Sequence, residues 1–90
     1  MNRTENITTL LQSLSPSTLE IADDSHQHAG HNHAAKRGGT HMRIKIVSEV
    51  FAGKSRIERH RMVQALLKAE FETGLHSLQI NAKTPAELGS

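Results

Sequence analysis

The chain has 90 residues, a formal net charge of +2 and only two aromatic residues. A chain of this length forms a single small domain, here with an aliphatic core, and no apolar run is long enough to cross a membrane. It contains no cysteine, which excludes disulfides, a cysteine nucleophile and a metal or iron–sulfur site built on its own thiolates. The first residues also lack the basic-then-apolar pattern of a secretory signal.

The charge is distributed unevenly along the chain. Residues 36–61 contain eight lysines and arginines against two acids, a net of +6, so the remaining residues sum to −4. A basic middle with acidic flanks indicates an anionic partner, either a nucleic acid or an acidic protein surface. The alternative is a solvated face that only aids solubility.

The first third of the chain predicts a helix, a short strand and a loop. Residues 4–14 carry apolar side chains at the spacing of one helix face, and Ser15-Pro16 ends that pattern. A short strand is predicted over residues 19–21, closed by Asp23-Asp24-Ser25. Residues 26–40 are polar, contain four histidines and have no apolar periodicity, so we expect a mobile loop.

The second strand has the clearest pattern in the sequence. From His41 to Val50, apolar residues at positions 42, 44 and 46 alternate with Arg43 and Lys45. Successive side chains on a strand point to opposite faces. The pattern therefore predicts a sheet with one face against the helices and one face in water.

A long helix is predicted from Ser55 to Gly74. Ser55 and Glu58 have the spacing of a capping box, and Gly74 can adopt the left-handed conformation that ends a helix. The short turn before Ser55 is either a simple turn or a separate helical piece that makes a helix–turn–helix-like corner. The apolar stripe of the long helix is formed by Ile57, Met62, Val63, Leu66, Leu67 and Phe71.

The last elements are a strand and a short helix. Residues 76–80 alternate as a third strand, and residues 84–87 begin a helix with Pro85 in its first position. The predicted order is helix, strand, strand, helix, strand, short helix. We therefore predict an α/β fold, residues 1–90 in one domain, with a three-stranded sheet covered by helices on one face.

Several short motifs occur in the order found in a known family. Phe51-x-Gly53-Lys54-Ser55 is followed by Arg59-His60-Arg61, a leucine-rich helix, Leu75-His76-Ser77-Leu78 and Ala82-Lys83-Thr84-Pro85. Over about residues 10–88 this series resembles the BolA family. The resemblance implies an α/β architecture similar to a class II KH domain, which agrees with the order predicted from periodicity.

The resemblance also implies metal ligands. In that family, a histidine or cysteine between the first two strands and the histidine opening the third strand bind a [2Fe–2S] cluster. A monothiol glutaredoxin shares the cluster through its own cysteine and a glutathione thiolate. Carried over, the strand ligand is His76 and the loop ligand is His28, within Ser25-x-x-His28-Ala29. The alternatives for the loop ligand are His26, His31 and His33.

Coordination chemistry supports the need for a partner. This chain has no thiol, but two imidazoles can replace two thiolates on one iron of a cluster. Such a half-site cannot close alone, and its affinity depends on pH because ligation requires neutral rings. Alternation with Leu78 and Ile80 places His76 on the core side of its strand. A structural histidine hydrogen-bonded to the backbone is the alternative role there.

Basic residues at the start of the long helix and at the end of the third strand form a second candidate site. A helix N-terminus favours anions, so we expect this group to contact the partner, its glutathione or a phosphate. The alternatives are a structural role for the histidine and a solvated strand end. The group consists of Lys54, Arg56, Arg59, His60, Arg61 and Lys83.

Three functions follow from these patterns. The first is a non-enzymatic partner of a monothiol glutaredoxin in iron–sulfur cluster assembly, trafficking or iron regulation, monomeric and without a cofactor when isolated. The second is a DNA-binding transcriptional regulator of stress response and cell morphology, a role that also occurs in the family. The third is a metal buffer that uses the histidine loop alone. We predict a cytoplasmic location, with the mitochondrial matrix as the alternative because the family occurs in both.

Overall fold

The computed structural model describes residues 2–25 and 38–88 of the chain. Two short 3-10 turns, Gln12–Leu14 and Glu49–Phe51, accompany the regular elements. The helices are α1 (Arg3–Leu11), α3 (Arg56–Leu66), α4 (Lys68–Glu72) and α5 (Pro85–Leu88), and the strands are β1 (Thr18–Asp23), β2 (His41–Val47) and β3 (Ser77–Lys83). None of the described helices has the length and apolar character needed to cross a membrane.

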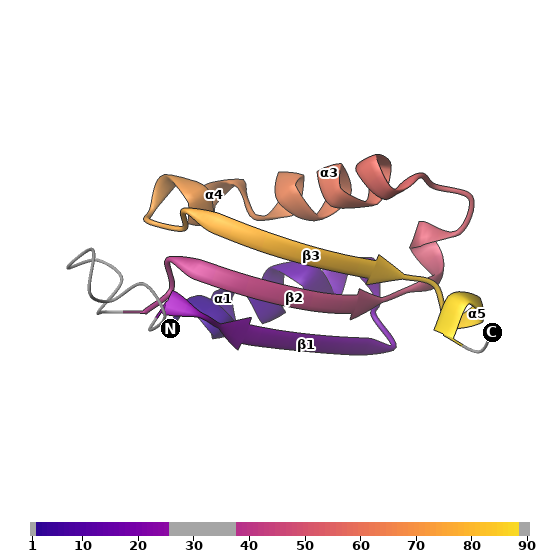
Figure 1. The fold of residues 1–90 in the computed structure, drawn as a ribbon, viewed down its shortest axis with the longest axis horizontal. Helices are drawn as coiled ribbons and strands as arrows, with labels where there is room; N and C mark the ends of the chain where they lie inside the picture. The colour runs from indigo at the N-terminus through magenta and orange to yellow at the C-terminus, as the bar shows by residue number, and fades with distance from the viewer. Residues whose placement is uncertain (1, 26–37, 89–90) are drawn as a thin grey trace.

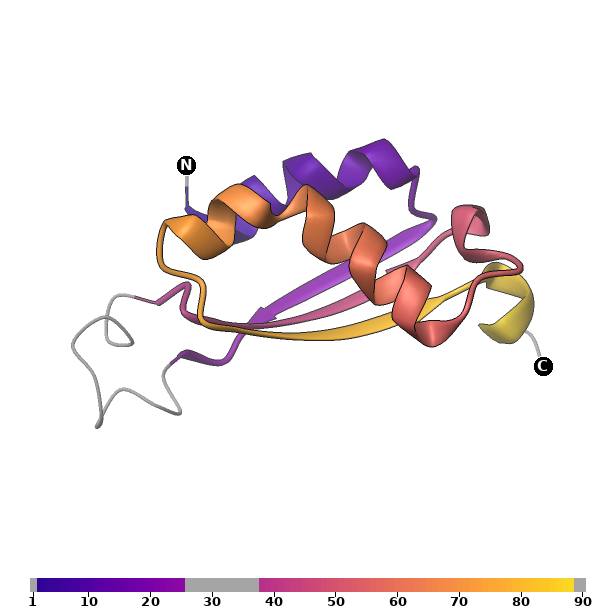
Figure 2. The same ribbon diagram turned by 90° about the horizontal axis from the view of Figure 1, so that it is seen from above.

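The three strands form one sheet with β2 in the centre (Figure 1). β1 pairs with β2 in antiparallel register, with Ile21 opposite Ile44, and β3 pairs with β2 in parallel register, with Ile80 opposite Ile44. The parallel pair requires a crossover, which α3 and α4 provide. Helices α1, α3 and α4 lie on the same face of the sheet (Figure 2), as the sequence predicts.

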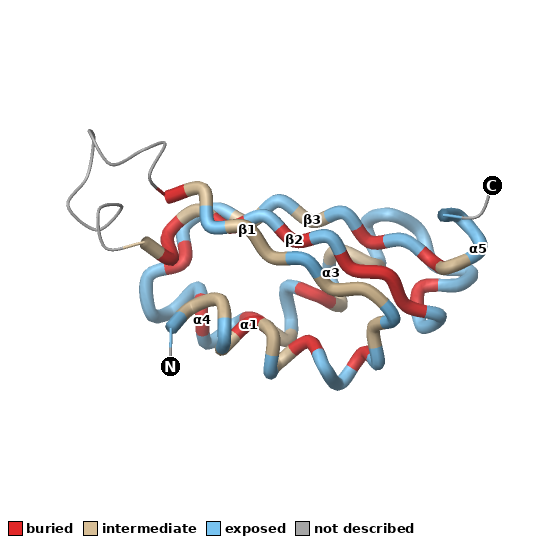
Figure 3. The backbone as a smooth tube through the Cα atoms, turned by 90° about the horizontal axis from the view of Figure 1, so that it is seen from below, coloured by how far each residue is buried: buried red, intermediate tan, exposed pale blue. Residues whose placement is uncertain are grey.

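The core lies between the sheet and these helices. The buried side chains of β2 are Met42, Ile44 and Ile46, whereas Arg43 and Lys45 are exposed on the other face. Figure 3 shows the buried residues concentrated on β2 and on the facing sides of the helices. The alternating pattern of β2 is therefore confirmed, because one face packs and the other meets water.

The caps of the long helical segment also follow the prediction. The Ser55 hydroxyl accepts a hydrogen bond from the N–H of Glu58 at 3.1 Å and begins α3. Gly74, with φ of +122°, follows the end of α4. The N–H of Leu75 then bonds to the carbonyl of Glu70 at 3.0 Å, which is the closing bond of a Schellman motif.

Several predicted boundaries are wrong. The first and third strands are Thr18–Asp23 and Ser77–Lys83, instead of the predicted 19–21 and 76–80. The second strand ends at Val47, three residues early, because the buried Ser48 hydroxyl accepts the N–H of Val50 and starts the 3-10 turn Glu49–Phe51. That turn is the separate helical piece left open by the sequence. Residues 39 and 40, predicted as mobile loop, are instead buried. The rest of that prediction, residues 26–37, lies outside the described residues.

The single long helix is also wrong in part. The chain leaves helical geometry at Leu67, with φ of −100° and ψ of 13°, so α3 and α4 are separate. Their apolar stripe is consequently interrupted: Ile57 is 63% exposed and Phe71 37% exposed. Glu70, by contrast, is 7% exposed and points into the protein.

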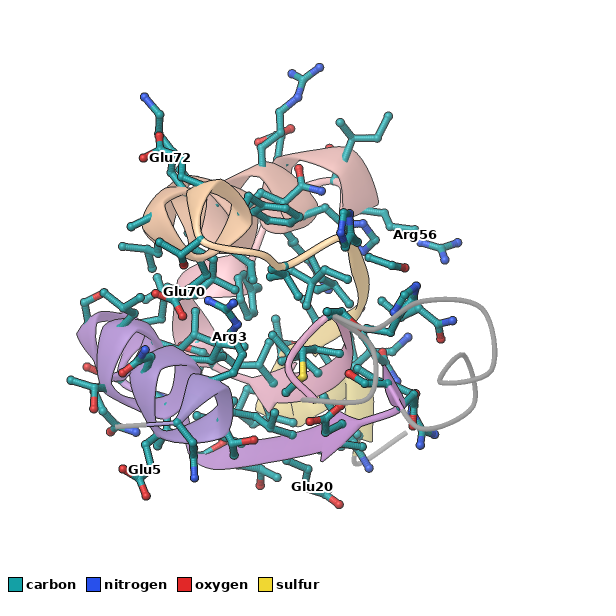
Figure 4. All side chains as sticks on the ribbon, turned by 90° about the vertical axis from the view of Figure 1, so that its left-hand side faces the viewer. Arg3, Glu5, Glu20, Arg56, Glu70 and Glu72 are labelled. Carbon is teal, nitrogen blue, oxygen red and sulfur yellow. The ribbon has the colours of Figure 1, made fainter. Side chains whose placement is uncertain are left out.

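The inward position of Glu70 is explained by Arg3 of α1. Arg3 Nη1 lies 2.8 Å from Glu70 Oε1, and the side chains of this ion pair are 16% and 9% exposed. The same guanidinium donates to the carbonyls of Gly39 and Thr73. Figure 4 shows Arg3 and Glu70 facing one another between α1 and α4. Arg3 thus fastens α1, α4 and the start of β2 together.

Candidate functional site

Two histidines lie together at the end of the sheet where β2 and β3 begin. His41 is the first residue of β2, and His76 immediately precedes β3. Because the two strands are parallel, with His41 opposite Ser77, both histidines come to the same end. Their ring centres are 6.4 Å apart. We call these two residues the histidine pair.

Thr40 positions both members of the pair. Its carbonyl accepts the N–H of His76 at 2.8 Å and the N–H of Ser77 at 3.0 Å. Its hydroxyl is hydrogen-bonded to Nδ1 of His41 at 2.9 Å. Thr40 is 4% exposed, so these bonds are made from a packed and well-defined position.

The segments on either side of residues 26–37 are held together beside the pair. The hydroxyl of Ser25, which is fully buried, accepts the N–H groups of Thr40 at 2.9 Å and His41 at 3.2 Å. The carboxylate of Asp23 accepts the N–H groups of Ser25 and Gly39, each at 2.9 Å. We call these four bonds the loop neck. The neck holds Ser25 and Gly39, which lie on either side of residues 26–37 in the sequence, next to the first residue of β2.

The structure places His76 differently from the prediction and does not describe the predicted loop ligands. His76 is exposed rather than on the core side of its strand, because the strand begins after it and Leu75 is buried instead. His41 was not predicted as a site residue. Only the register of β2 and β3, which the sequence does not reveal, brings it beside His76. The candidate loop ligands, His26, His28, His31 and His33, lie outside the described residues.

The described part of the chain cannot complete a metal site alone. Within residues 2–25 and 38–88, no group of three or more histidine, cysteine, aspartate or glutamate side chains is arranged to hold a metal ion. The histidine pair offers two imidazoles, and neither is accompanied by a thiolate because the chain has none. Any further ligands must come from residues 26–37, from solvent or from a partner.

The second candidate site is a pocket of about 570 Å³ at the other end of the sheet. Five of the six predicted basic residues line it, and Arg61 is the one that does not. We call it the basic pocket. Its lining consists of Lys54, Arg56, Arg59, His60, Ile80, Asn81, Ala82, Lys83 and Glu87.

Within the basic pocket, Arg59 has a structural role. Its guanidinium donates to the carbonyls of Lys54 at 3.0 Å and Ala82 at 3.1 Å, and it lies 2.7 Å from Glu87 Oε1. Glu87 also closes a capping box with Thr84 at the start of α5. The Thr84 N–H, and then Arg59, lower the pKa of the Glu87 carboxyl from 4.5 to about 2.

The other basic residues of the pocket remain exposed to a ligand. Lys54, Arg56 and Lys83 are exposed, and His60 is partly buried beside them. Three permanent cations around a hollow favour an anionic group, either a phosphate or a carboxylate of a partner. Arg59 anchors the walls of this pocket and the other three supply its accessible charge.

The histidine pair and the basic pocket are well separated. The pair lies where β2 and β3 begin, and the pocket is lined by the end of β3 and the start of α3 (Figure 1). Val47 lies six positions after His41 on β2, which corresponds to about 20 Å, and the molecule is 41 Å long. One small ligand cannot touch both sites.

Comparisons with known proteins place these features in a family context. Residues 10–87 match the model of the family described as BolA-like protein. The chain is 48% identical over 83 residues to "SufE-like protein 1, chloroplastic/mitochondrial" of Arabidopsis thaliana; the match covers 88% of this chain and 22% of that protein. It is 44% identical over 86 residues to "UV-induced protein uvi31" of Schizosaccharomyces pombe, covering 89% of this chain and 82% of the relative.

A solved structure gives the same result at the level of the fold. The BolA domain of SufE1 from Arabidopsis thaliana superposes with a TM-score of 0.86 at 46% identity, over 97% of this chain and 96% of that one. The α/β architecture with three strands is thereby confirmed. This chain spans only about a fifth of the length of SufE-like protein 1, so the match concerns one domain of that relative.

Proposed function

Because this chain belongs to the BolA-like family, we propose that it is a non-enzymatic partner of a monothiol glutaredoxin. In this proposal the two proteins share a [2Fe–2S] cluster, and the chain acts in cluster assembly, trafficking or iron regulation. The isolated chain is a monomer without a cofactor. It works in the cytoplasm or, as the alternative, in the mitochondrial matrix.

The observation that carries the proposal is the position of His76. It is exposed, it lies at the end of the sheet, and its backbone is fixed by Thr40. The loop neck holds Ser25 and Gly39 at the same end, and the sequence between them contains four further histidines. Two imidazoles suit one iron of a cluster, as in Rieske centres. The donor set of the chain therefore fits half of such a site.

The cluster ligands that this chain lacks indicate what its partner must supply. A chain without thiols requires a partner that supplies them, and a monothiol glutaredoxin carrying glutathione offers two. On this side, His76 and one loop histidine, His28 or an alternative in the same segment, each donate a neutral ring nitrogen. The protein's own contribution is to hold these rings at a solvent-open edge that a second protein can cover.

The test is reconstitution under anaerobic conditions with a monothiol glutaredoxin and glutathione, followed by visible circular dichroism. We expect a spectrum distinct from that of the glutaredoxin alone, and a heterodimer by size exclusion. His76→Ala should change the spectrum, whereas His60→Ala, at the far end of the sheet, should keep the wild-type bands in whatever heterodimer forms. A wild-type spectrum from His76→Ala would overturn the assignment of His76 as ligand.

A second candidate function is DNA binding by a transcriptional regulator of stress response. The basic pocket favours it, because Lys54, Arg56 and Lys83 present cations to a phosphate backbone. Binding of this kind weakens steeply with salt. A mobility shift with duplex DNA at low salt, reduced by Lys54→Gln and Lys83→Gln together, would support it. The absence of any shift at low salt would rule it out.

A further inference from the structure

His41 has no role in the function proposed above, yet it is the residue that the fold places beside His76. We propose that His41 and His76 together bind a divalent transition-metal ion, such as Zn²⁺, on the isolated chain. The site takes one ion, held by two imidazoles from adjacent strand ends, with water at the remaining positions. It requires neither a glutaredoxin nor a cluster.

The separation of the two rings suits one shared ion. A zinc–nitrogen bond is about 2.0–2.1 Å, so the ion lies roughly 3.2 Å from each ring centre, and two such rings are about 5 to 6.4 Å apart. The observed separation is 6.4 Å, with the rings tilted by 34°. The observed value is the upper limit, which corresponds to a linear arrangement, so the exposed side chain of His76 must rotate toward His41 to reach the shorter distance of tetrahedral geometry.

Thr40 provides the support that a metal-binding histidine normally has. Its hydroxyl is hydrogen-bonded to Nδ1 of His41 at 2.9 Å. In the tautomer that donates its Nδ1 proton to this oxygen, Nε2 of His41 is the nitrogen that binds the metal. The carbonyl of the same residue accepts the N–H of His76. One buried residue therefore sets the ring of one ligand and the backbone of the other.

The backbones of the two ligands are also held in place before any metal binds. The N–H of His41 is bound by the fully buried Ser25 hydroxyl, and the strands beginning at His41 and Ser77 are paired in register. Preorganised ligands lose little conformational freedom on binding. The pair is thus a better-defined site than a set of histidines on one segment of sequence.

The loop histidines must be removed as a source of metal binding before the pair is tested. We would make the full-length chain with His26, His28, His31 and His33 each changed to Gln, and titrate it with Zn²⁺ by calorimetry. Further variants on this background carry His41→Gln or His76→Gln. His60→Gln, at the basic pocket, is the matched control because it also removes one partly exposed histidine. Amide NMR spectra establish that each variant is folded.

We expect one Zn²⁺ per chain on the loop-substituted background. Either His41→Gln or His76→Gln should weaken binding by about tenfold or more, and His60→Gln should leave it unchanged. Thr40→Val should weaken binding by about 10–100-fold, as loss of an outer hydrogen bond to a ligand does, and Thr40→Ser should restore it. In ring-nitrogen NMR, Zn²⁺ should shift Nε2 of His41, and Thr40→Val should alter the tautomer of that ring.

Several outcomes would overturn the proposal. They are the absence of Zn²⁺ binding on the loop-substituted background, equal losses from His41→Gln and His60→Gln, and a shift at His76 without one at His41. None of these measurements includes glutaredoxin, glutathione or a cluster. A negative Zn²⁺ titration would therefore not contradict the proposed shared cluster. A negative cluster reconstitution would likewise not contradict the proposed zinc site.

Discussion

At the scale of single residues, Arg3 and Glu70 decide how the helices meet. The two residues are 67 positions apart, and neither has a pattern in the sequence that indicates burial. Burying a carboxylate is costly unless it is paired and hydrogen-bonded. Glu70 meets this condition through Arg3 and through Asn6, whose side-chain amide donates to it at 3.3 Å. The ion pair therefore explains why Glu70 faces inward.

We predict that Arg3→Ala lowers the free energy of unfolding by about 3 kcal/mol, because it leaves a buried carboxylate without its partner. Urea denaturation followed by circular dichroism measures this. Arg61→Ala is the control, since Arg61 is exposed, and should change stability by less than about 0.5 kcal/mol. Equal stabilities of the two variants would show that the ion pair has no structural importance.

The Glu87 carboxyl predicts a pH dependence at the opposite end of the molecule. Its folded pKa of about 2 lies below the ordinary value of 4.5. Its contribution to stability is therefore fully present above about pH 4.5 and is lost as the pH falls toward 2. The stability difference between the wild type and Glu87→Gln should shrink across this window in urea titrations.

A direct measurement is the side-chain carboxyl NMR titration of Glu87. Arg59→Met should move its midpoint upward, because it removes one of the two groups that lower the pKa. A Glu87 midpoint near 4.5 in the wild-type protein would contradict the arrangement of Thr84, Arg59 and Glu87 described here.

At the scale of elements, local chemistry in the sequence predicted most of the fold. The alternation around Ile44, the cap at Ser55, the stop at Gly74 and the first position of Pro85 are all confirmed. Each depends on residues close together in the chain. The break at Leu67 was not predicted, because the helical spacing continues through it. The structure also pairs Glu70 of α4 with Arg3 of α1, and periodicity cannot predict a contact between residues so far apart in the chain.

The candidate site residues also fall into two groups: those that local sequence patterns identify and those that they do not. Five of the six predicted basic residues line one pocket; four of them are neighbours in sequence, and Lys83 belongs to a recognisable motif. His41 was missed because its closeness to His76 depends on strand register. A pattern of alternating residues gives the face of a strand but not the residue opposite to it on the next strand. The signal that could have found His41 is its position at the first residue of a strong strand.

Gly74 gives a prediction for the end of α4. Its φ is +122°, and an added Cβ would lie 3.2 Å from Arg3 Nη2. Gly53 also has a positive φ, +74°, but an added Cβ would meet nothing within 4 Å. We expect Gly53→Ala to cost about 1–2 kcal/mol from backbone strain. Gly74→Ala should cost more, because it also disturbs the guanidinium of Arg3.

Thermal denaturation of both variants checks this expectation. The two substitutions make the same chemical change, but φ of Gly74 lies further from the left-handed region than φ of Gly53. A larger loss for Gly74→Ala therefore reports both this backbone strain and the contact with Arg3, and a smaller loss than for Gly53→Ala would contradict the expectation.

At the scale of the whole molecule, the two ends of the sheet carry two different groups of side chains. Imidazoles gather where β2 and β3 begin, and lysines and arginines gather where β3 ends. Figure 1 shows these two ends of the sheet on opposite sides of the molecule. A protein partner large enough to cover one long face can reach both. A metal ion or a phosphate can reach only one.

This separation predicts additive effects. In binding to a monothiol glutaredoxin, the free-energy losses caused by His76→Ala and Lys83→Ala should sum to that of the double variant within about 0.5 kcal/mol, as for distant sites. Calorimetry of the two single variants and the double variant measures this. Lys83→Ala should also lose its effect in high salt, whereas His76→Ala should not. Strong coupling would mean that the two ends of the sheet do not act independently.

The loop neck has a consequence for how such a domain can change in evolution. Asp23 and Ser25 close the neck through bonds to the backbone of Gly39, Thr40 and His41, and no side chain of residues 26–37 takes part in those four bonds. Doubling the length of a closed loop costs only about 0.6 kcal/mol. Insertions and replacements within residues 26–37 should therefore cost little folding stability, provided that the four bonds of the loop neck are kept.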